Sequence, residues 1–393
     1  MSEMTATSQL PAIQKPALAI AIISAVVIAV LAYDVSPQKS LLFGIGIILG
    51  VALYHAAFGF TGVYRRALTD GDISGVLAQM VMLVVAMLLF WPMLSAGEVF
   101  GQRVGGTIAP VGVAMALGAF VFGIGMQWAG GCASGTLFIA GGGSIRMVVV
   151  LIAFCMGAFL GSLHFGWWQT LPRFKSMSLA GEFGWPSAIA IQIGVLAMIA
   201  FILFRLGGHI KKPLWFQDGF HPRMLLRGPW PLLLAALVLA LMNAATLSVA
   251  GHAWAVTWGF TLWGAKLAQL VGWDAATSAF WSGRFTSGAL ERSVFSDTVS
   301  LMNFGIIAGS LAAASLAGRL KPTLRIPLPA IASAVIGGLM LGYGARLAYG
   351  CNIGAFFSGV ASTSLHGWAW IVCAIIGNVI GLRLKLLVFG QRG

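Results

Sequence analysis

Charged residues are scarce in this chain. Only 8% of its 393 residues are Asp, Glu, Lys or Arg, whereas 59% are apolar. A typical soluble domain carries about 25% charged residues, so this composition excludes a soluble globular protein. Apolar runs of about 20 residues recur along the sequence, and each is long enough to cross about 30 Å of hydrocarbon. The sequence therefore predicts an all-α, polytopic protein embedded in a lipid bilayer.

Acidic residues are the scarcest of the charged ones. There are 10 of them against 23 Lys and Arg, which gives a net charge of +13. The cations lie mostly in short loops, where they set topology against anionic lipid, so we expect no nucleic-acid partner. We divide the chain into a cytoplasmic tail (1–16), a first membrane half (17–204), a basic cytoplasmic linker (205–228) and a second membrane half (229–393). The linker holds five cations against one acid, Asp218: Arg205, Lys211, Lys212, Arg223 and Arg227.

Cysteine is also rare, and the four that occur are Cys132, Cys155, Cys351 and Cys373. None forms a CxxC pair and all lie in apolar surroundings, which argues against a zinc ribbon, a thioredoxin-like site and a secreted disulfide framework. The chain also lacks a Walker loop, a dinucleotide fingerprint and a nucleophile elbow. We therefore expect no cofactor, no metal and no ATP-driven step within this chain.

Against these absences stands a thirteen-residue pattern that occurs twice. It reads GIGMQWAGGCASG over 123–135 and GYGARLAYGCNIG over 342–354. When the two cysteines are aligned, five small residues of the first copy (Gly123, Gly125, Ala129, Gly131, Gly135) fall on five of the second (Gly342, Gly344, Ala348, Gly350, Gly354). Each copy interrupts a long apolar stretch, which is how repeat-built transporters make a site at the midplane of the bilayer.

The loop charges indicate how the two copies are related. Loop 99–106 carries one charge, whereas its counterpart 319–325 carries three cations. By the positive-inside rule the two loops lie on opposite sides, so we expect an inverted repeat with re-entrant Gly-Cys loops. Plain crossings at 231–247 and 256–273 would put 319–325 outside, and we therefore expect segment 274–297 to cross once more in broken form.

The chemistry of such a break favours an anion. A helix that starts at midplane aims unsatisfied N–H groups and its positive dipole end into the gap. Gly131 and Gly135 in the first break, and Gly350 and Gly354 in the second, let the backbone approach closely. A thiol is a soft, weak donor that suits a sulfur-bearing substrate better than a hard ion. Cys132 and Cys351 are thus the pathway candidates. Cys155 and Cys373 lie inside continuous helices and are interpreted as packing residues.

Three polar residues extend this candidate pathway. Arg346 lies five residues before Cys351 and is positioned to attract an anion. Lys266 lies in an apolar stretch, where a cation is either functional or extends to the membrane surface, and we leave both interpretations open. Asn352 could bond a substrate oxygen, although capping of the following helix is the simpler interpretation.

The two breaks resemble the YeeE/YedE family of bacterial inner-membrane sulfur transport proteins. The similarity is carried by GYGARLAYGCNIGAFFSGVASTSLHGW (342–368) and by GGCASGTLF (130–138). The resemblance implies uptake of thiosulfate or a related inorganic sulfur compound, handed between cysteine thiols through S–H hydrogen bonds. Many members carry a further cysteine after the second helix, where AAFGFTGVYRR has Gly59 in this chain. Some relatives are proposed to handle selenium compounds.

Three functions remain open at this point. The first is a transporter or channel for a small sulfur oxyanion, most simply thiosulfate. The second is a membrane component that delivers sulfur, selenium or redox equivalents to a cytoplasmic sulfur-accepting protein. An enzyme of that kind needs an activating base, and no acid or His adjoins either pathway cysteine in sequence, so we do not expect an enzyme. The third is a scaffold subunit, which leaves the repeated breaks unexplained.

Overall fold

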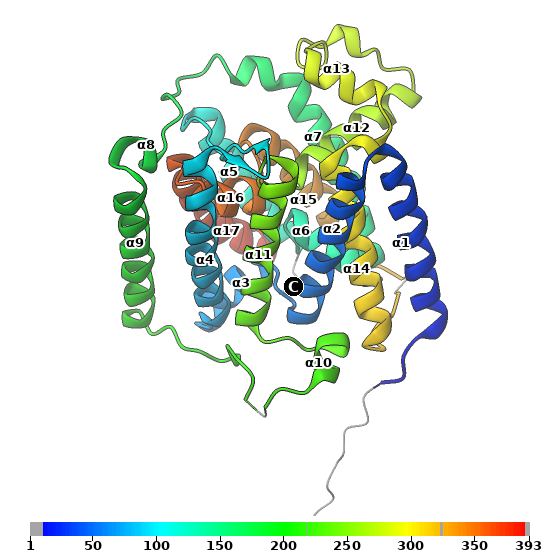
Figure 1. The fold of residues 1–393 in the computed structure, drawn as a ribbon, viewed down its shortest axis with the longest axis vertical. Coiled ribbons are helices and arrows are strands. Elements are labelled where there is room, and N and C mark those ends of the chain that lie inside the picture. Colours follow the sequence, from blue (N-terminus) through cyan, green and yellow to red (C-terminus); the bar gives the residue numbers. More distant parts are fainter. Residues whose placement is uncertain (1–10, 218, 323–324, 390–393) are drawn as a thin grey trace, which may run out of the picture.

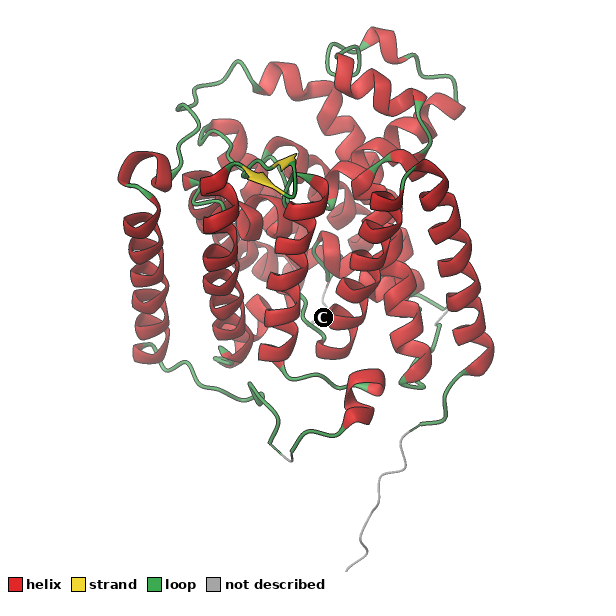
Figure 2. Cartoon of the chain, in the orientation of Figure 1, coloured by secondary structure: helices red, strands yellow, loops and turns green. Residues whose placement is uncertain are grey.

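The computed structural model of the protein describes residues 11–217, 219–322 and 325–389. Helices dominate it, and two short strands, β1 (Glu98–Val99) and β2 (Gln102–Arg103), form an antiparallel hairpin (Figure 2). The tail predicted over 1–16 ends where α1 begins, at Lys15, and its residues 1–10 lie outside the described residues. The helices, in chain order, are α1 (Lys15–Val35), α2 (Pro37–Ala56), α3 (Phe60–Asp70), α4 (Ser74–Ala96), α5 (Val113–Ala129), α6 (Ala133–Gly141), α7 (Ile145–Trp168), α8 (Leu179–Phe183), α9 (Trp185–Arg205), α10 (Pro222–Arg227), α11 (Leu232–Ala250), α12 (Thr257–Leu270), η1 (Ala275–Thr277), α13 (Arg284–Glu291), η2 (Val294–Ser296), α14 (Thr298–Leu316), α15 (Leu328–Leu347), η3 (Asn352–Phe357), α16 (Ser358–Ala361) and α17 (Leu365–Phe389).

Ten helical segments within the described residues are long and apolar enough to cross a membrane. The polytopic all-α prediction is therefore confirmed. Three of the ten are interrupted: Pro37–Asp70 contains the break between α2 and α3, Val113–Gly141 the break between α5 and α6, and Leu328–Ala361 the break between α15 and α16. The repeated Gly-Cys pattern predicted the last two breaks but not the first.

The spanning helices run between two ends of the molecule (Figure 1). The linker with α10 lies at one end, which we call the linker face. Helices α8 and α13 lie at the other end, which we call the α13 face. Lys39 at the start of α2 bonds Thr298 at the start of α14, so these two helices begin together at the α13 face.

The expected course of residues 256–297 is wrong. Helix α12 has only 14 residues, and neither it nor any part of 274–297 is among the ten candidate spans of the described chain. Instead α12 and α13 lie together at the α13 face, where Lys266 of α12 donates to the carbonyls of Leu290 and Arg292. The chain thus makes two crossings fewer than expected before loop 319–325. A change of two leaves this loop on the same side, and the chain reaches the linker face there, where Arg227 donates to the Leu316 carbonyl.

Glycine allows the central helices to approach closely. A Cβ at Gly342 of α15 would lie 2.1 Å from the Phe154 carbonyl oxygen of α7, and one at Gly377 of α17 would lie 2.1 Å from that of Phe120 in α5. Such separations are far below van der Waals contact, so only glycine fits there. These contacts pack α15 against α7 and α17 against α5, which fixes the helices on both sides of each Cys break.

Candidate functional site: two thiols where three helices begin

The first break places Cys132 at the start of a helix. Helix α5 ends at Ala129, and Gly130 closes it with φ +78°, a left-handed conformation that glycine adopts at no steric cost. The carbonyl of Trp128, freed at this helix end, accepts from Arg146 at 3.0 Å and from Ser333 at 2.7 Å. Cys132 then caps α6, because its Sγ accepts the Gly135 N–H at 3.4 Å. The thiol is thus buried at a helix N-terminus.

The second break repeats this arrangement with a different backbone. After α15 ends, Tyr349 (φ +59°) and Gly350 (φ +149°) redirect the chain. A Cβ on Gly350 would lie 2.8 Å from the Ala355 nitrogen, so glycine is required at this position. Cys351 precedes η3, and its thiol lies next to the N–H groups of Ile353 and Gly354 without a cap hydrogen bond of standard geometry.

The structure brings the two thiols together. Cys132 and Cys351 are each 1% exposed, and they lie within electrostatic range of one another. A Cβ on Gly135 would lie 3.3 Å from the Cys132 Sγ, so glycine keeps the space beside that thiol open. Gly131 and Gly354, by contrast, have room for a methyl group at ordinary contact distance.

A third helix also begins at this point. Gly59 precedes α3, and the backbone N–H of Phe60, the first residue of α3, lies next to the Cys132 thiol. The starts of α3, α6 and η3 therefore converge on the thiols, and each contributes roughly half a positive charge. In the described chain, no Lys or Arg is among the groups that interact with either thiol.

Three buried polar side chains around these helix starts lack partners. Tyr64, one turn into α3, lies within electrostatic range of Cys132 and beside the Asn352 side chain. Within the described residues, the Tyr64 hydroxyl and both amide atoms of Asn352 make no hydrogen bond of standard geometry, and neither does the Thr61 hydroxyl. Thr61 and Tyr64 are three residues apart and so share one face of α3. The capping interpretation of Asn352 is therefore wrong, because its amide caps nothing.

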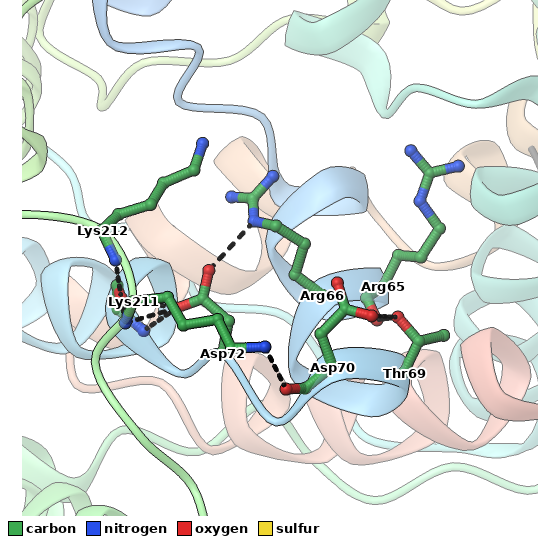
Figure 3. Close-up of polar contacts among 8 residues, drawn as sticks. Arg65, Arg66, Thr69, Asp70, Asp72, Lys211 and Lys212 are labelled. Atoms are coloured by element: carbon green, nitrogen blue, oxygen red, sulfur yellow. Dashed lines mark hydrogen bonds and ion pairs between the residues drawn. The ribbon is translucent and has the colours of Figure 1, made fainter.

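Helix α3 is anchored at its far end by the linker. Asp72, just beyond α3, pairs with Arg66 at 3.4 Å and accepts from the backbone N–H of Lys211 (Figure 3). Burial opposes ionisation of Asp72, but hydrogen bonds from Ser74 and Lys211, together with the Arg66 charge, hold its pKa below the ordinary value. This is the only ion pair between side chains among the described residues, and it fixes the helix that aims Phe60 and Tyr64 at the thiols.

A basic cavity lies at each end of the molecule. At the linker face a cavity of about 560 Å³ is lined by Tyr54, Phe138 and Ser144, and by four cations: Arg146, Arg319, Lys321 and Arg325. At the α13 face a cavity of about 390 Å³ is lined by Ala255, with the charged or titratable side chains Lys39, His252, Arg292 and Asp297. An anion is thus attracted at both ends, although the thiols themselves are closed off from both.

The two predicted cations lie outside the convergence of helix starts. The part-buried Arg346 guanidinium lies between the rings of Phe165 and Phe280, 4.8 and 5.0 Å from their centroids. It carries a positive charge on the helix that enters the second break, but it is stacked on aromatic faces. Lys266 is satisfied by two carbonyls at the C-terminal end of α13, which is a structural role.

Sequence reasoning missed Thr61, Tyr64 and the start of α3. The signal was present in AAFGFTGVYRR, where Gly59 interrupts a long apolar stretch, as glycine does in the two cysteine breaks. Without a cysteine at this position, the break did not match the repeated pattern. The other two cysteines lie inside continuous helices, as expected for packing residues: Cys155 is buried in α7 and Cys373 is half-buried in α17.

The chain is similar to known transport proteins. A family model described as "Sulphur transport" matches residues 55–380. The chain is 38% identical over 160 residues to the "Probable transporter YedE" of Escherichia coli K12, a match that covers 40% of this chain and 38% of that protein. It is 28% identical over 276 residues to the "Thiosulfate transporter TsuA" of Spirochaeta thermophila, covering 67% of this chain and 74% of that protein.

A second TsuA, from Escherichia coli K12, is 25% identical over 352 residues, 84% of this chain and 90% of that protein. The match to YedE spans well under half the length of that relative, whereas the family model covers most of this chain, both cysteine breaks and the start of α3. The ten apolar helical segments agree with a transport protein that crosses the membrane many times. This chain belongs to the YeeE/YedE sulphur transport family.

Proposed function

We propose that the protein takes up a small inorganic sulfur oxyanion, thiosulfate, across the bacterial inner membrane by way of its two buried thiols. One observation carries the proposal: a line of neighbouring groups runs between the two cavities through both cysteines. At the α13 face, Ala255 lines the cavity. A Cβ added to Gly354 would lie 3.9 Å from the Ala255 Cβ, and the Gly354 N–H lies next to the Cys351 thiol.

The same line continues toward the linker face. Cys351 is within electrostatic range of Cys132, and the Cys132 thiol adjoins the N–H of Phe60. Phe60 follows Gly59, where an added Cβ would lie 3.6 Å from the Phe138 ring, and Phe138 lines the cavity at the linker face. An anion that follows this line meets N–H groups and thiols at each step, and a basic cavity at each end.

The proposal includes an inverted repeat built from α5–α7 and α15–α17, in which each Gly-Cys break interrupts one membrane-spanning segment. The inverted orientation is supported by where the chain goes after each break. Ser144, after the first, lines the cavity at the linker face, whereas Thr363, after the second, bonds Ser178 beside α8 at the α13 face. The basic linker then makes the linker face cytoplasmic by the positive-inside rule.

The mechanism we propose transfers the anion without covalent chemistry. Thiols donate weakly through S–H, and their polarizable sulfur suits the terminal sulfur of thiosulfate. The three helix starts offset about one and a half charges of a divalent anion. Sulfur delivery by persulfide chemistry would instead require a thiolate and a base. The groups found next to the thiols are backbone N–H and hydroxyl groups, so we favour transport. A cytoplasmic sulfur-accepting partner stays a prediction.

Growth and uptake measurements test this function. A bacterium that lacks its own sulfur-oxyanion uptake would be grown on thiosulfate, sulfite or sulfate, with and without this protein. Purified protein in liposomes would then be assayed for uptake of ³⁵S-thiosulfate. We expect growth on thiosulfate and uptake that Cys351→Ser abolishes. Wild-type liposomes that take up no more thiosulfate than empty ones would refute the proposal.

A further inference from the structure

Polar atoms without partners are rare inside proteins, and in the described chain three of them, on Tyr64 and Asn352, lie beside the thiols. More than nine-tenths of buried polar groups in well-determined structures are hydrogen-bonded, so each exception calls for an explanation. Tyr64 is 5% exposed and Asn352 is fully buried, yet the hydroxyl of one and both amide atoms of the other lack partners in the described chain. They lie beside each other on α3 and η3, two of the three helices that begin at the thiols.

The chemistry of these groups complements that of the thiols. A tyrosine hydroxyl offers one O–H donor and an asparagine amide offers two N–H donors, all of which suit the oxygen atoms of an oxyanion. Donors of this kind are about twice as strong toward a charged acceptor as toward a neutral one. The thiols of Cys132 and Cys351 suit a soft terminal atom instead. The four side chains therefore present a hard end and a soft end to one small ligand.

We propose that Tyr64 and Asn352 bind the oxygen atoms of the transported anion while the two thiols face its terminal sulfur. This inference rests on the transport function proposed above and specifies how the substrate is selected. The ligand class is a tetrahedral oxyanion with one soft terminal atom. Its charge is balanced by helix starts and hydrogen-bond donors, with no lysine or arginine in contact. Tyr64 and Asn352 are thus specificity-determining residues.

The competing explanation is an ordered water that satisfies the same groups permanently. Tyr64→Phe separates the two, because it deletes the hydroxyl and keeps the ring. We expect the apparent KM for ³⁵S-thiosulfate uptake in liposomes to rise about 10- to 100-fold, as for loss of a hydrogen bond to a charged group. We also expect the Tm of the substrate-free protein to stay the same or rise, since the deleted hydroxyl makes no hydrogen bond of standard geometry with the protein. Asn352→Leu, of similar volume, should behave in the same way.

Tyr343→Phe is the matched control. Its hydroxyl bonds His164 and Trp168 between α15 and α7, so its loss should lower the Tm and leave the KM unchanged. A KM within two-fold of wild type for Tyr64→Phe would overturn the inference, and so would a Tm loss as large as that of Tyr343→Phe. Wild-type protein that takes up no thiosulfate would instead refute the transport function, and that measurement is made before any variant is compared.

Discussion

Cys132 has two roles that a pair of substitutions can separate. Its thiol caps α6 through the Gly135 N–H, and in the proposed function it also meets the substrate. Alanine removes both the cap and the sulfur. Serine keeps a capping oxygen, and is among the best N-cap residues, but removes the soft atom. Stability should therefore distinguish the two variants, whereas uptake should not.

The magnitudes follow from the geometry. Loss of an N-cap acceptor costs about 1 kcal/mol, and deleting one buried sulfur atom from a closely packed site adds up to about 1 kcal/mol. Cys132→Ala should thus lose about 1–2 kcal/mol of unfolding free energy. Cys132→Ser should lose less than about 0.5 kcal/mol, because its hydroxyl can accept from Gly135 and bond the Ser134 hydroxyl that now lies 3.5 Å from the thiol.

The assay combines thermal unfolding in detergent with ³⁵S-thiosulfate uptake in liposomes. Both Cys132 variants should lose uptake, while Cys155→Ala and Cys373→Ala should transport nearly as wild type does. Uptake by Cys132→Ser at the wild-type rate would show that the thiol only caps α6. Equal destabilisation of the serine and alanine variants would show that the cap contributes nothing.

Three further predictions follow. In a cysteine-free variant that retains its fold, Ser144→Cys should react with an impermeant thiol reagent from the cytoplasm. Ser176→Cys is exposed in the segment that bonds Thr363, and it should react from the periplasm. Labelling of both from one side would exclude the inverted repeat. Arg346→Gln should raise the apparent KM for thiosulfate, with uptake partly restored at high substrate, because a part-buried positive charge on the entering helix is lost; an unchanged concentration dependence would remove Arg346 from the pathway. Asp72→Asn should cost about 2 kcal/mol at neutral pH, since hydrogen bonds to a charged group are lost. Because the folded-state pKa of Asp72 lies below its unfolded value, this difference should shrink as the pH falls below about 4, and a pH-independent difference in unfolding experiments would contradict the assignment.

Much of the fold was open to prediction because a bilayer imposes strong constraints on sequence. Every backbone group in hydrocarbon must be satisfied within a helix, so apolar length locates most of the crossings. The charge of the linker and of loop 319–325 predicted that both lie on one side of the membrane, and in the structure both lie at the linker face. Prediction failed at 256–297, because apolar composition cannot distinguish a short helix at the membrane surface from a crossing.

The sequence by itself determined that Cys132 and Cys351 occupy equivalent breaks, since a repeated glycine pattern is a local feature that can be read along the chain. Only the tertiary structure decided that the two thiols lie within electrostatic range of each other, that α3 starts beside them, and that Tyr64 and Asn352 lie together without hydrogen bonds of standard geometry. Asn352 and Tyr64 are 288 positions apart in the chain, and no local pattern records a contact at that distance. Their proximity depends on the packing of α3 and η3 in the folded protein, which places the hydroxyl and amide donors beside the thiols.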